Sequence, residues 1–332
     1  MTDKPNGSIP YILCIHRITR PSMSGATLST SKKIDKHVFL MGRPPMSEFL
    51  GVVSSQVNYD ASHIAQLADD WRLASNHILK LQKDQASAPD KPAYKDVPAN
   101  LKLLAEQALT DEIFQRSFNV VKPVVRMVEL DSLVVSQKHI NLNYVEELKK
   151  QLGKTPSDED IFKTCIPIEH PMPEISASRV SSNSFVFVSQ SADLRVLDST
   201  LLRPNQIKNY TTSGPMATVL GMAVGTGSNC LNSMFVNGRM ILNNGSHRAY
   251  ALRSMGITYA PCIVQQVTCK DELDIVATAE FLQNPAEFIE APRPAMLKDY
   301  FDLELIKILP VQRKRRQIKI SYTIETIDVP DI

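Results

Sequence analysis

The most constraining feature of the sequence is an Asn-Gly pair between two short apolar runs. The runs SMFV and RMIL flank Asn237 and Gly238. Asn-Gly is the preferred dipeptide of a type I′ hairpin turn, because both central residues of that turn need positive φ angles. The sequence therefore predicts a two-stranded antiparallel hairpin at this point of the chain.

A helix and a third strand are predicted directly after the hairpin. Ser246 is predicted to be the N-cap of a helix with the sequence HRAYALRSM. Gly256 is typical of the residue just beyond a helix end, where the backbone turns left-handed. The run YAPCIVQQV then predicts a strand. Residues 233–267 are thus expected to form a hairpin, a helix and a strand.

The start of this predicted helix carries the residues best suited to bind a ligand. The segment that joins strand to helix is Asn244, Gly245, Ser246, His247 and Arg248. The free N–H groups and the dipole of a helix start favour an anion, and Gly permits close approach of the backbone. His and Arg side chains can bind phosphate oxygens. We interpret the segment as a candidate phosphate or nucleotide site; the alternative is a capped helix start with exposed side chains.

The segment FVNGRMILNNGSHRAYALRSMGITYAPCIV resembles the core of the ParB/sulfiredoxin superfamily. In that family a strand delivers a Gly-x-His-Arg or Gly-Glu-Arg-Arg motif to a helix, followed by Ala, Gly-Ile, Pro and Val at fixed spacings. The residues that fit are Gly245, His247, Arg248, Ala251, Gly256, Ile257, Pro261 and Val264. Upstream, VRMVELDSLVVSQKHINLNYVEELKKQLG resembles the opening strand and helix of the family.

This resemblance implies an α+β fold with a ParB/sulfiredoxin-like mixed sheet and a site for ATP, ADP or CTP, with or without Mg²⁺. Kinase-like members keep a carboxylate near the first strand as a general base, which implies a catalytic role for Glu129 or Asp131 together with His247. The alternative is that both carboxylates are exposed at a strand end. Ser246 occupies the position of the reactive Cys of sulfiredoxins, so sulfinic acid reduction is not expected.

Two classes of function stay open, because members of this family differ in activity. The first is a nucleotide-binding protein that acts as a phosphotransferase or nucleotide hydrolase. The second is a DNA-associated or regulatory module without turnover. A basic run that could contact a nucleic-acid backbone consists of Arg313, Lys314, Arg315 and Arg316. The alternative for this run is a solvated face.

A second possible phosphate-facing loop lies in GMAVGTGSN, which contains Gly221, Gly225 and Gly227. The Lys-Ser/Thr pair of a P-loop is missing there. The stretch before it is expected to hold a short helix.

Three segments are expected along the chain: an extension at 1–118, a ParB/sulfiredoxin-like domain at 119–268 with a long insertion at 154–232, and C-terminal helices with a strand at 269–332. In the first segment, apolar residues at helical spacing predict helices over 60–85 and 99–117, which could pair as a hairpin. Trp71 lies on the apolar face of the first helix, where it is expected to pack in a core or contact a partner.

Further elements are predicted from periodicity and from Gly and Pro signals. Strands are expected near 36–42, over 124–130, over 184–189 with a hairpin partner at 193–198, and from Ile318 onward. A helix capped by Asn141 or Asn143 should end at Gly153, and further helices are expected over 270–284 and 295–308. Residues 154–183 are expected to be a long loop.

Composition excludes several classes of protein. Lys and Arg number 37 and Asp and Glu number 35 in 332 residues, so the net charge of +2 provides no global attraction to nucleic acid or acidic membranes. The chain contains neither an apolar run of about 18 residues nor the apolar core of a signal peptide, so a cytoplasmic location without a membrane partner is expected. Five scattered cysteines without a CxxC pair predict neither a disulfide framework nor a metal site.

Overall fold

The computed structural model describes residues 33–43, 45–56 and 59–330. The irregular N-terminal chain expected at 1–32 lies outside the described residues. The chain divides into two compact units. We call Ser31–Pro171 with Ser228–Arg313 the main unit, and the unit that includes Met172–Gly227 and the chain from Lys314 the second unit.

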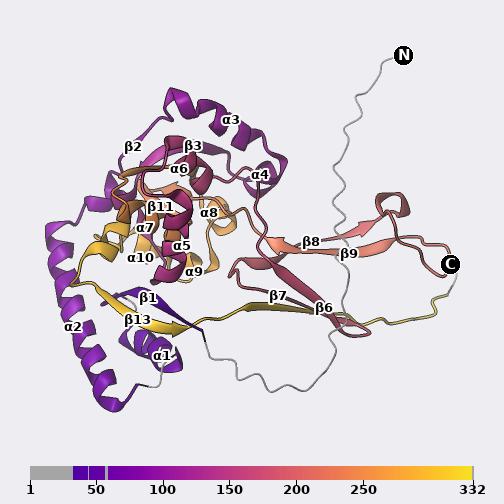
Figure 1. Cartoon of the computed structure of the whole chain (residues 1–332), viewed down its shortest axis with the longest axis horizontal. Helices are drawn as coiled ribbons and strands as arrows, with labels where there is room; N and C mark the ends of the chain where they lie inside the picture. Colours follow the sequence, from indigo (N-terminus) through magenta and orange to yellow (C-terminus); the bar gives the residue numbers. More distant parts are fainter. Residues whose placement is uncertain (1–32, 44, 57–58, 331–332) are drawn as a thin grey trace. The chain divides into compact units, whose positions relative to one another are not determined.

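The main unit is built on a six-stranded mixed sheet, which we call the central sheet (Figure 1). Its strands, in spatial order, are β2 (Tyr94–Lys95), β3 (Pro123–Glu129), β12 (Tyr259–Gln266), β10 (Asn232–Val236), β11 (Arg239–Asn244) and β4 (Val134–Val135). Strand β10 is parallel to β12 and β11 is parallel to β4, whereas the other neighbours are antiparallel. The predicted α+β class, the strand over 124–130 and the Asn237-Gly238 hairpin are confirmed, with φ angles of 50° and 80° at the two turn residues.

Helices cover both faces of the central sheet. Since side chains alternate between the two faces of a strand, one strand can contribute to the apolar cores on both sides. On β11, Met240 and Leu242 belong to the largest apolar core, whereas Ile241 belongs to a smaller core on the other face. The larger core contains side chains of α3 (Lys102–Thr110), α4 (Glu112–Ser117), α5 (Leu142–Leu152), α6 (Asp158–Cys165) and α7 (Ser246–Ser254). The smaller core contains side chains of α8 (Lys270–Val276), α9 (Ala279–Leu282) and α10 (Pro285–Ile289).

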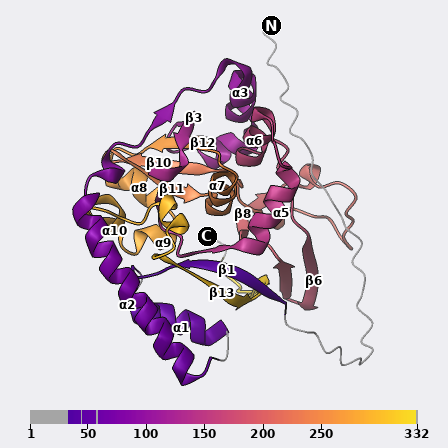
Figure 2. The ribbon, with the colours of Figure 1, turned by 60° about the vertical axis from the view of Figure 1, so that its left-hand side comes forward.

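A second sheet of the main unit is antiparallel and three-stranded. Its central strand β1 (Ile34–Leu40) lies between β13 (Ile306–Gln312) and β5 (His139–Asn141). Val38 and Leu40 face the largest core, and Phe39 and Met41 face a third core. That third core also contains side chains of α1 (Met46–Gln56) and α2 (Ala61–Asp84), and Figure 2 shows both helices along one side of β1 and β13.

The helices of the N-terminal part form, but they do not pair with each other as the sequence suggested. Helix α2 begins after Asp60, whose side chain accepts a hydrogen bond from the N–H of His63, and Trp71 packs against the third core. The helix expected over 99–117 is interrupted at Asp111, because the carboxylate of that residue caps α4. The buried side chains of α2 lie in the third core and those of α3 in the largest core, so no helical hairpin results.

The three segments expected from the sequence do not match the two units. Strand β2 from the first expected segment pairs with β3, and β13 from the last pairs with β1, so strands from distant parts of the chain complete both sheets. Long-range pairing of this kind has no local sequence signal.

The predicted helix capped by Asn141 and ending at Gly153 is confirmed as α5.

The second unit contains two small antiparallel sheets. One consists of β14 (Arg316–Ser321), β7 (Ser184–Ser189) and β6 (Ile175–Ser181), and the other of β8 (Leu194–Leu202) and β9 (Val219–Thr226). The strands expected over 184–189 and from Ile318 are confirmed. The proposed pairing of 193–198 with 184–189 is wrong, because β8 pairs with β9.

Three other expectations are also wrong. The segment 154–183 is not one long loop, because Ser157 and Asp160 form a capping box that starts α6, and β6 follows. The short helix expected before Gly221 is strand β9. Residues 295–308 form a short 3₁₀ helix and the start of β13.

The described chain also contains short 3₁₀ helices, which are η1 (Ala88–Asp90), η2 (Ala99–Leu101), η3 (Leu130–Ser132), η4 (Pro204–Gln206) and η5 (Leu297–Phe301).

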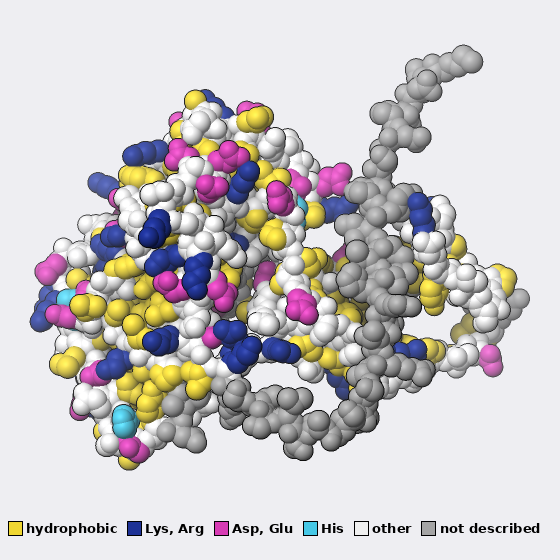
Figure 3. Space-filling view, viewed as in Figure 1, with side chains coloured by type: hydrophobic (Ala, Val, Ile, Leu, Met, Phe, Trp, Pro, Cys, Tyr) yellow, Lys and Arg dark blue, Asp and Glu magenta, His cyan; other side chains and the backbone are white. Residues whose placement is uncertain are grey.

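Charge is mixed on the face of the molecule shown in Figure 3. On the face shown in Figure 3, Lys and Arg side chains are interspersed with Asp and Glu, as expected for a chain with a net charge of +2. Within the described ranges, no helix combines the length and apolar character needed to span a bilayer.

Candidate functional site

Helix α7 begins with free backbone donors. Gly245 is its N-cap, in a left-handed conformation with φ of 96°, and its own N–H donates to Oδ1 of Asn244 over 2.7 Å. No described residue accepts a hydrogen bond from the N–H groups of Ser246, His247 or Arg248. Three adjacent donors and the positive end of the helix dipole therefore point out of the helix start.

Ser246 is not the N-cap that the sequence predicted. It is the first helical residue, and its side chain makes no capping hydrogen bond. The left-handed backbone at Gly245 places the cap one residue earlier, in a position where the cap residue has no side chain.

The glycine at 245 is explained by packing as well as by conformation. A Cβ atom at this position would lie 2.7 Å from Cδ1 and 2.9 Å from Cα of Leu231. Leu231 directly precedes β10, so the start of α7 and the start of this strand lie in close contact at Gly245. Gly245 thus fixes where α7 begins relative to the central sheet.

Arg248 differs from the other buried arginines of the described chain. Three arginines are buried there: Arg239, Arg248 and Arg293, with exposed fractions of 5%, 7% and 1%. Asp90 pairs with Arg239 over 2.8 Å and Asp299 pairs with Arg293 over 2.6 Å. Arg248 has no carboxylate partner in the described residues and donates one hydrogen bond, to Oδ1 of Asn229 over 2.9 Å. Its positive charge is therefore buried without a counter-charge.

The thiols close to Arg248 do not supply that counter-charge. Cys165 and Cys230 are both buried and lie within range of its electrostatic field. Burial raises the pKa of Cys230 to about 12, and it raises the pKa of Cys165 further, although the positive Arg248 acts against both shifts. Both thiols are therefore neutral near neutral pH.

His247 acts as a structural acceptor. Its Nε2 accepts a hydrogen bond from the backbone N–H of Asn141 over 3.0 Å, and Asn141 is the N-cap of α5. Burial lowers the pKa of His247 to about 4, and the nearby His139, His37 and Arg248 lower it as well. The neutral ring thus ties the start of α7 to the start of α5, and Nε2 is already occupied.

The start of α7 opens into a pocket of about 150 Å³, which we call the α7 pocket. Its lining comes from four parts of the main unit: Ser136, Gln137 and Tyr144; Asn229; Leu242 to Arg248; and Thr278 with Glu280. All five residues that the sequence singled out, Asn244 to Arg248, line it. The volume is below the usual range for a whole small-molecule ligand and suits a group the size of a phosphate.

Two of the predicted catalytic residues do not reach this pocket. Asp131 forms a two-pronged ion pair with Arg253 in the last turn of α7, with distances of 2.6 and 2.9 Å. Glu129 ends β3, and neither carboxylate lines the α7 pocket. Asp131 thus contacts the opposite end of the helix, roughly 10 Å along its axis from the pocket, and Glu129 pairs with Tyr259 in the central sheet. The structure therefore does not assemble Glu129 or Asp131 with His247.

The other candidate segments also have structural roles. Gly221 and Gly225 lie within β9 and pair with β8, so they do not form a phosphate-facing loop. In the basic run, Arg313 pairs with the buried Asp35 over 2.6 Å and holds the pKa of that carboxyl below its usual value. Arg316 donates to the carbonyl of Ala192.

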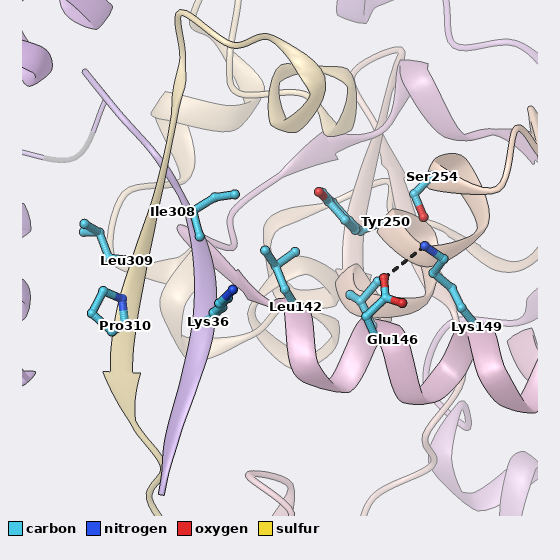
Figure 4. A pocket seen from close by; sticks show the side chains of 10 residues that line it. Lys36, Leu142, Glu146, Lys149, Tyr250, Ser254, Ile308, Leu309 and Pro310 are labelled. Carbon is cyan, nitrogen blue, oxygen red and sulfur yellow. Dashed lines mark hydrogen bonds and ion pairs between the residues drawn. The ribbon is translucent and has the colours of Figure 1, made fainter.

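A larger cavity of about 570 Å³ lies elsewhere in the main unit (Figure 4). Its walls are mostly apolar, with Leu142 of α5, Tyr250 of α7 and Ile308 of β13 around it. Its only carboxylate, Glu146, is paired with Lys149 over 3.0 Å. Of its other charged groups, Lys36 is exposed to solvent, so the cavity contains no buried charge without a partner. The α7 pocket is therefore the stronger candidate for a binding site.

Some residues of the α7 pocket were missed by sequence reasoning. Asn229 holds Arg248, and Glu280 adds the pocket's one carboxylate. Asn243 holds the chain just before α9, the helix that contains Glu280. The side chain of Asn243 donates a hydrogen bond to the carbonyl of Val276 and accepts one from the N–H of Thr278. These residues are distant from Arg248 in the sequence and follow no motif, so only the fold brings them together.

Comparison of the chain with protein-family models, with curated proteins and with solved structures found no match.

Proposed function

We propose that the main unit binds a phosphate-bearing ligand at the start of α7, and that this ligand is a nucleotide of the ATP, ADP or CTP type. One observation carries the proposal: Arg248 is 7% exposed, lines the α7 pocket and lacks a carboxylate partner among the described residues. The choice of nucleotide rests on the sequence resemblance to the ParB/sulfiredoxin superfamily.

The physical argument is that a buried charge needs compensation. Burying an unpaired cation costs several kcal/mol, and a bound anion removes this cost. The three free N–H groups of Ser246, His247 and Arg248 add donors to the same anion. A guanidinium can also form two parallel hydrogen bonds with phosphate oxygens. In the proposed complex, the phosphate group fills the pocket, and the sugar and base lie outside it.

The proposed role of each residue follows from its contacts. Arg248 and the helix start hold the phosphate, and Asn229 orients the guanidinium. His247 keeps the starts of α5 and α7 together. If the protein turns over its nucleotide, Glu280 is the carboxylate positioned to act as a base, since it lines the pocket. A Mg²⁺ ion would have this one carboxylate and would take its other ligands from phosphate and water.

The test is a calorimetric titration of the whole chain with ATP, ADP, CTP and GTP, each with and without Mg²⁺. The proposal expects heat of binding for at least one nucleotide at concentrations up to the millimolar range. Absence of binding for all four, in a folded sample, contradicts it. Release of phosphate in the same samples would separate a binding module from a hydrolase.

No specific observation favours the DNA-associated alternative. Arg313 is paired with Asp35, and Arg316, although exposed, is bonded to a carbonyl group. The other two cations of the run, Lys314 and Arg315, are exposed.

A further inference from the structure

The second unit contains a strand whose outer edge has no partner among the described residues. Strands β8 and β9 form a two-stranded antiparallel ribbon, in which Leu201 lies opposite Leu220 and Val196 lies opposite Val224 (Figure 1). Within the described chain, β8 alone forms backbone hydrogen bonds with β9. About half of the N–H and C=O groups of β9 therefore point away from β8, where they can pair with another strand.

One face of this ribbon is apolar and exposed to solvent. Directly opposite residues of an antiparallel pair lie on the same face, and side chains alternate between the two faces. The register thus places Val196, Leu201, Leu220, Met222 and Val224 on one face, which we call the ribbon face. Leu201 and Leu220 are each 67% exposed. Because a two-stranded ribbon is marginally stable by itself, a strand added at the edge of β9 would stabilise it.

Strand β9 lacks the residues by which proteins protect an open edge. Such edges commonly carry a Lys, a Pro or an inward-pointing charge that prevents pairing with another chain. The sequence of β9, VLGMAVGT, contains no charged residue and no proline. The two charged residues of β8, Arg195 and Asp198, lie opposite Gly225 and Ala223 and therefore on the other face of the ribbon. A strand that approaches the ribbon face at the edge of β9 meets no charge.

We infer that β9 pairs with β9 of a second copy of this chain, antiparallel and about a twofold axis at Met222. This axis places Met222 opposite the Met222 of the second copy, and Leu220 opposite Val224, so every pair on the ribbon face is apolar. An axis at Ala223 would place Leu220 opposite Thr226 instead. The pairing converts two separate ribbons into one four-stranded sheet with a continuous apolar face, which is the more stable arrangement.

A second copy suits this edge better than an unrelated strand. Strand β9 has no charge with which to select a partner of opposite charge, whereas its apolar residues are complementary to themselves in the register given above. Twofold dimers with self-complementary surfaces are also the commonest homo-oligomers. A single pair of edge strands of eight residues buries less surface than a standard interface. The dimer should therefore form reversibly and depend on protein concentration.

The experiment measures the association of the full chain by analytical ultracentrifugation between about 1 and 200 µM. It compares the wild type with Met222→Lys and with a matched control, Leu201→Lys. Both positions are exposed on the ribbon face, but Leu201 lies on β8, away from the paired edge. In Met222→Lys two like charges lie directly opposite each other, so the dissociation constant should rise by at least about tenfold. Leu201→Lys should change it by less than about threefold.

Cysteine cross-linking locates the contact without relying on the lysine variants. Met222→Cys is compared with Leu201→Cys under a copper–phenanthroline catalyst in air, where two thiols lose two protons and two electrons to oxygen and form a disulfide. Directly opposite residues have Cβ atoms about 4.5–5.5 Å apart, which is close to disulfide geometry. The two copies of Leu201 would lie three strand spacings apart, roughly 14 Å. Native cysteines are common to both variants, so an excess of cross-linked dimer in Met222→Cys reports the proposed contact.

The outcomes separate edge pairing from other modes of association. A wild type that stays monomeric up to about 200 µM refutes the inference. Equal weakening by Met222→Lys and Leu201→Lys indicates stacking of ribbon faces, and no weakening by either indicates an interface elsewhere, so both results also refute it. Selective weakening by Met222→Lys together with selective cross-linking of Met222→Cys supports it. If circular dichroism shows that a lysine variant does not fold, the cross-linking comparison decides alone, and equal cross-linking of the two cysteine variants refutes the inference.

Discussion

Replacement of Gly245 by Ala tests how the start of α7 is held against the central sheet. The residue has a φ of 96°, and a left-handed backbone costs a residue with a side chain about 1–2 kcal/mol. The new methyl group would also lie 2.9 Å from Cα of Leu231, so one of two backbone segments must move. Overpacking of this kind costs about 1–3 kcal/mol. The sum predicts a loss of about 2–5 kcal/mol in the free energy of unfolding.

Gly256→Ala is the matched control. Gly256 follows the C-terminal end of the same helix and has a φ of 85°, but nothing lies within 4 Å of the position of its Cβ atom. It should therefore show the conformational cost alone, about 1–2 kcal/mol. Denaturant titrations of both variants would measure the difference, provided that the slope of the unfolding free energy against denaturant is unchanged.

The expected result is a Gly245→Ala variant that is less stable than Gly256→Ala by at least about 1 kcal/mol. A double variant with Leu231→Ala should show a favourable coupling, because the clash with Cδ1 of Leu231 is removed while the contact with Cα persists. If Gly245→Ala costs no more than Gly256→Ala, the close approach to Leu231 does not restrict this position, and the reasoning is refuted.

Three further predictions concern the same helix. Ser246→Ala should change the free energy of unfolding by less than about 0.5 kcal/mol in a denaturant titration, because this side chain does not cap α7; a loss of 1 kcal/mol or more, which is typical of a removed N-cap, would contradict the geometry. The folded-state pKa of His247 is about 4, below the 6.5 of an unperturbed His, so the unfolded chain binds a proton that the native chain does not. Stability should fall as the pH drops from 6.5 to 4, by at most about 1.4 kcal/mol per pH unit for this group, and His247→Gln should lessen the slope in a pH series of urea titrations. Asp131→Asn should lower stability by about 0.5–1 kcal/mol, because its ion pair with Arg253 is about one-third exposed, and calorimetry should find nucleotide binding unchanged; a loss of binding would return Asp131 to the site.

Local patterns predicted the elements that depend on neighbouring residues. The Asn237-Gly238 turn, the cap at Asn141 and the end of α5 at Gly153 each involve residues close in sequence, and all three are confirmed. The sequence also indicated the segment Asn244 to Arg248, and these residues do line one pocket.

Features that depend on tertiary contacts could not be predicted. The helix expected over 99–117 breaks at Asp111, because the cap that this residue forms outweighs the helical periodicity of the segment. The segment expected to hold a short helix forms β9 instead, because it pairs with β8. The N-cap is Gly245, in a left-handed conformation, and Leu231 lies directly against it, a contact that no local pattern shows. The carboxylate of the pocket is Glu280 and not Glu129 or Asp131, since the fold places α9 beside the start of α7.

The most direct test of the central claim is to remove the charge of Arg248 while retaining its bulk. Arg248→Met should weaken binding of the best nucleotide by about tenfold to a hundredfold in calorimetry, the loss of a hydrogen bond to a charged group. The ligand-free variant should be at least as stable as the wild type, because the charge that it loses has no carboxylate partner in the described chain. Arg293→Met should instead lose about 3–5 kcal/mol, since it removes the two-pronged partner of the buried Asp299 and leaves only Arg43, 3.6 Å away. Unchanged nucleotide affinity in Arg248→Met, or destabilisation as large as that of Arg293→Met, would show that Arg248 is a structural residue and would contradict the account.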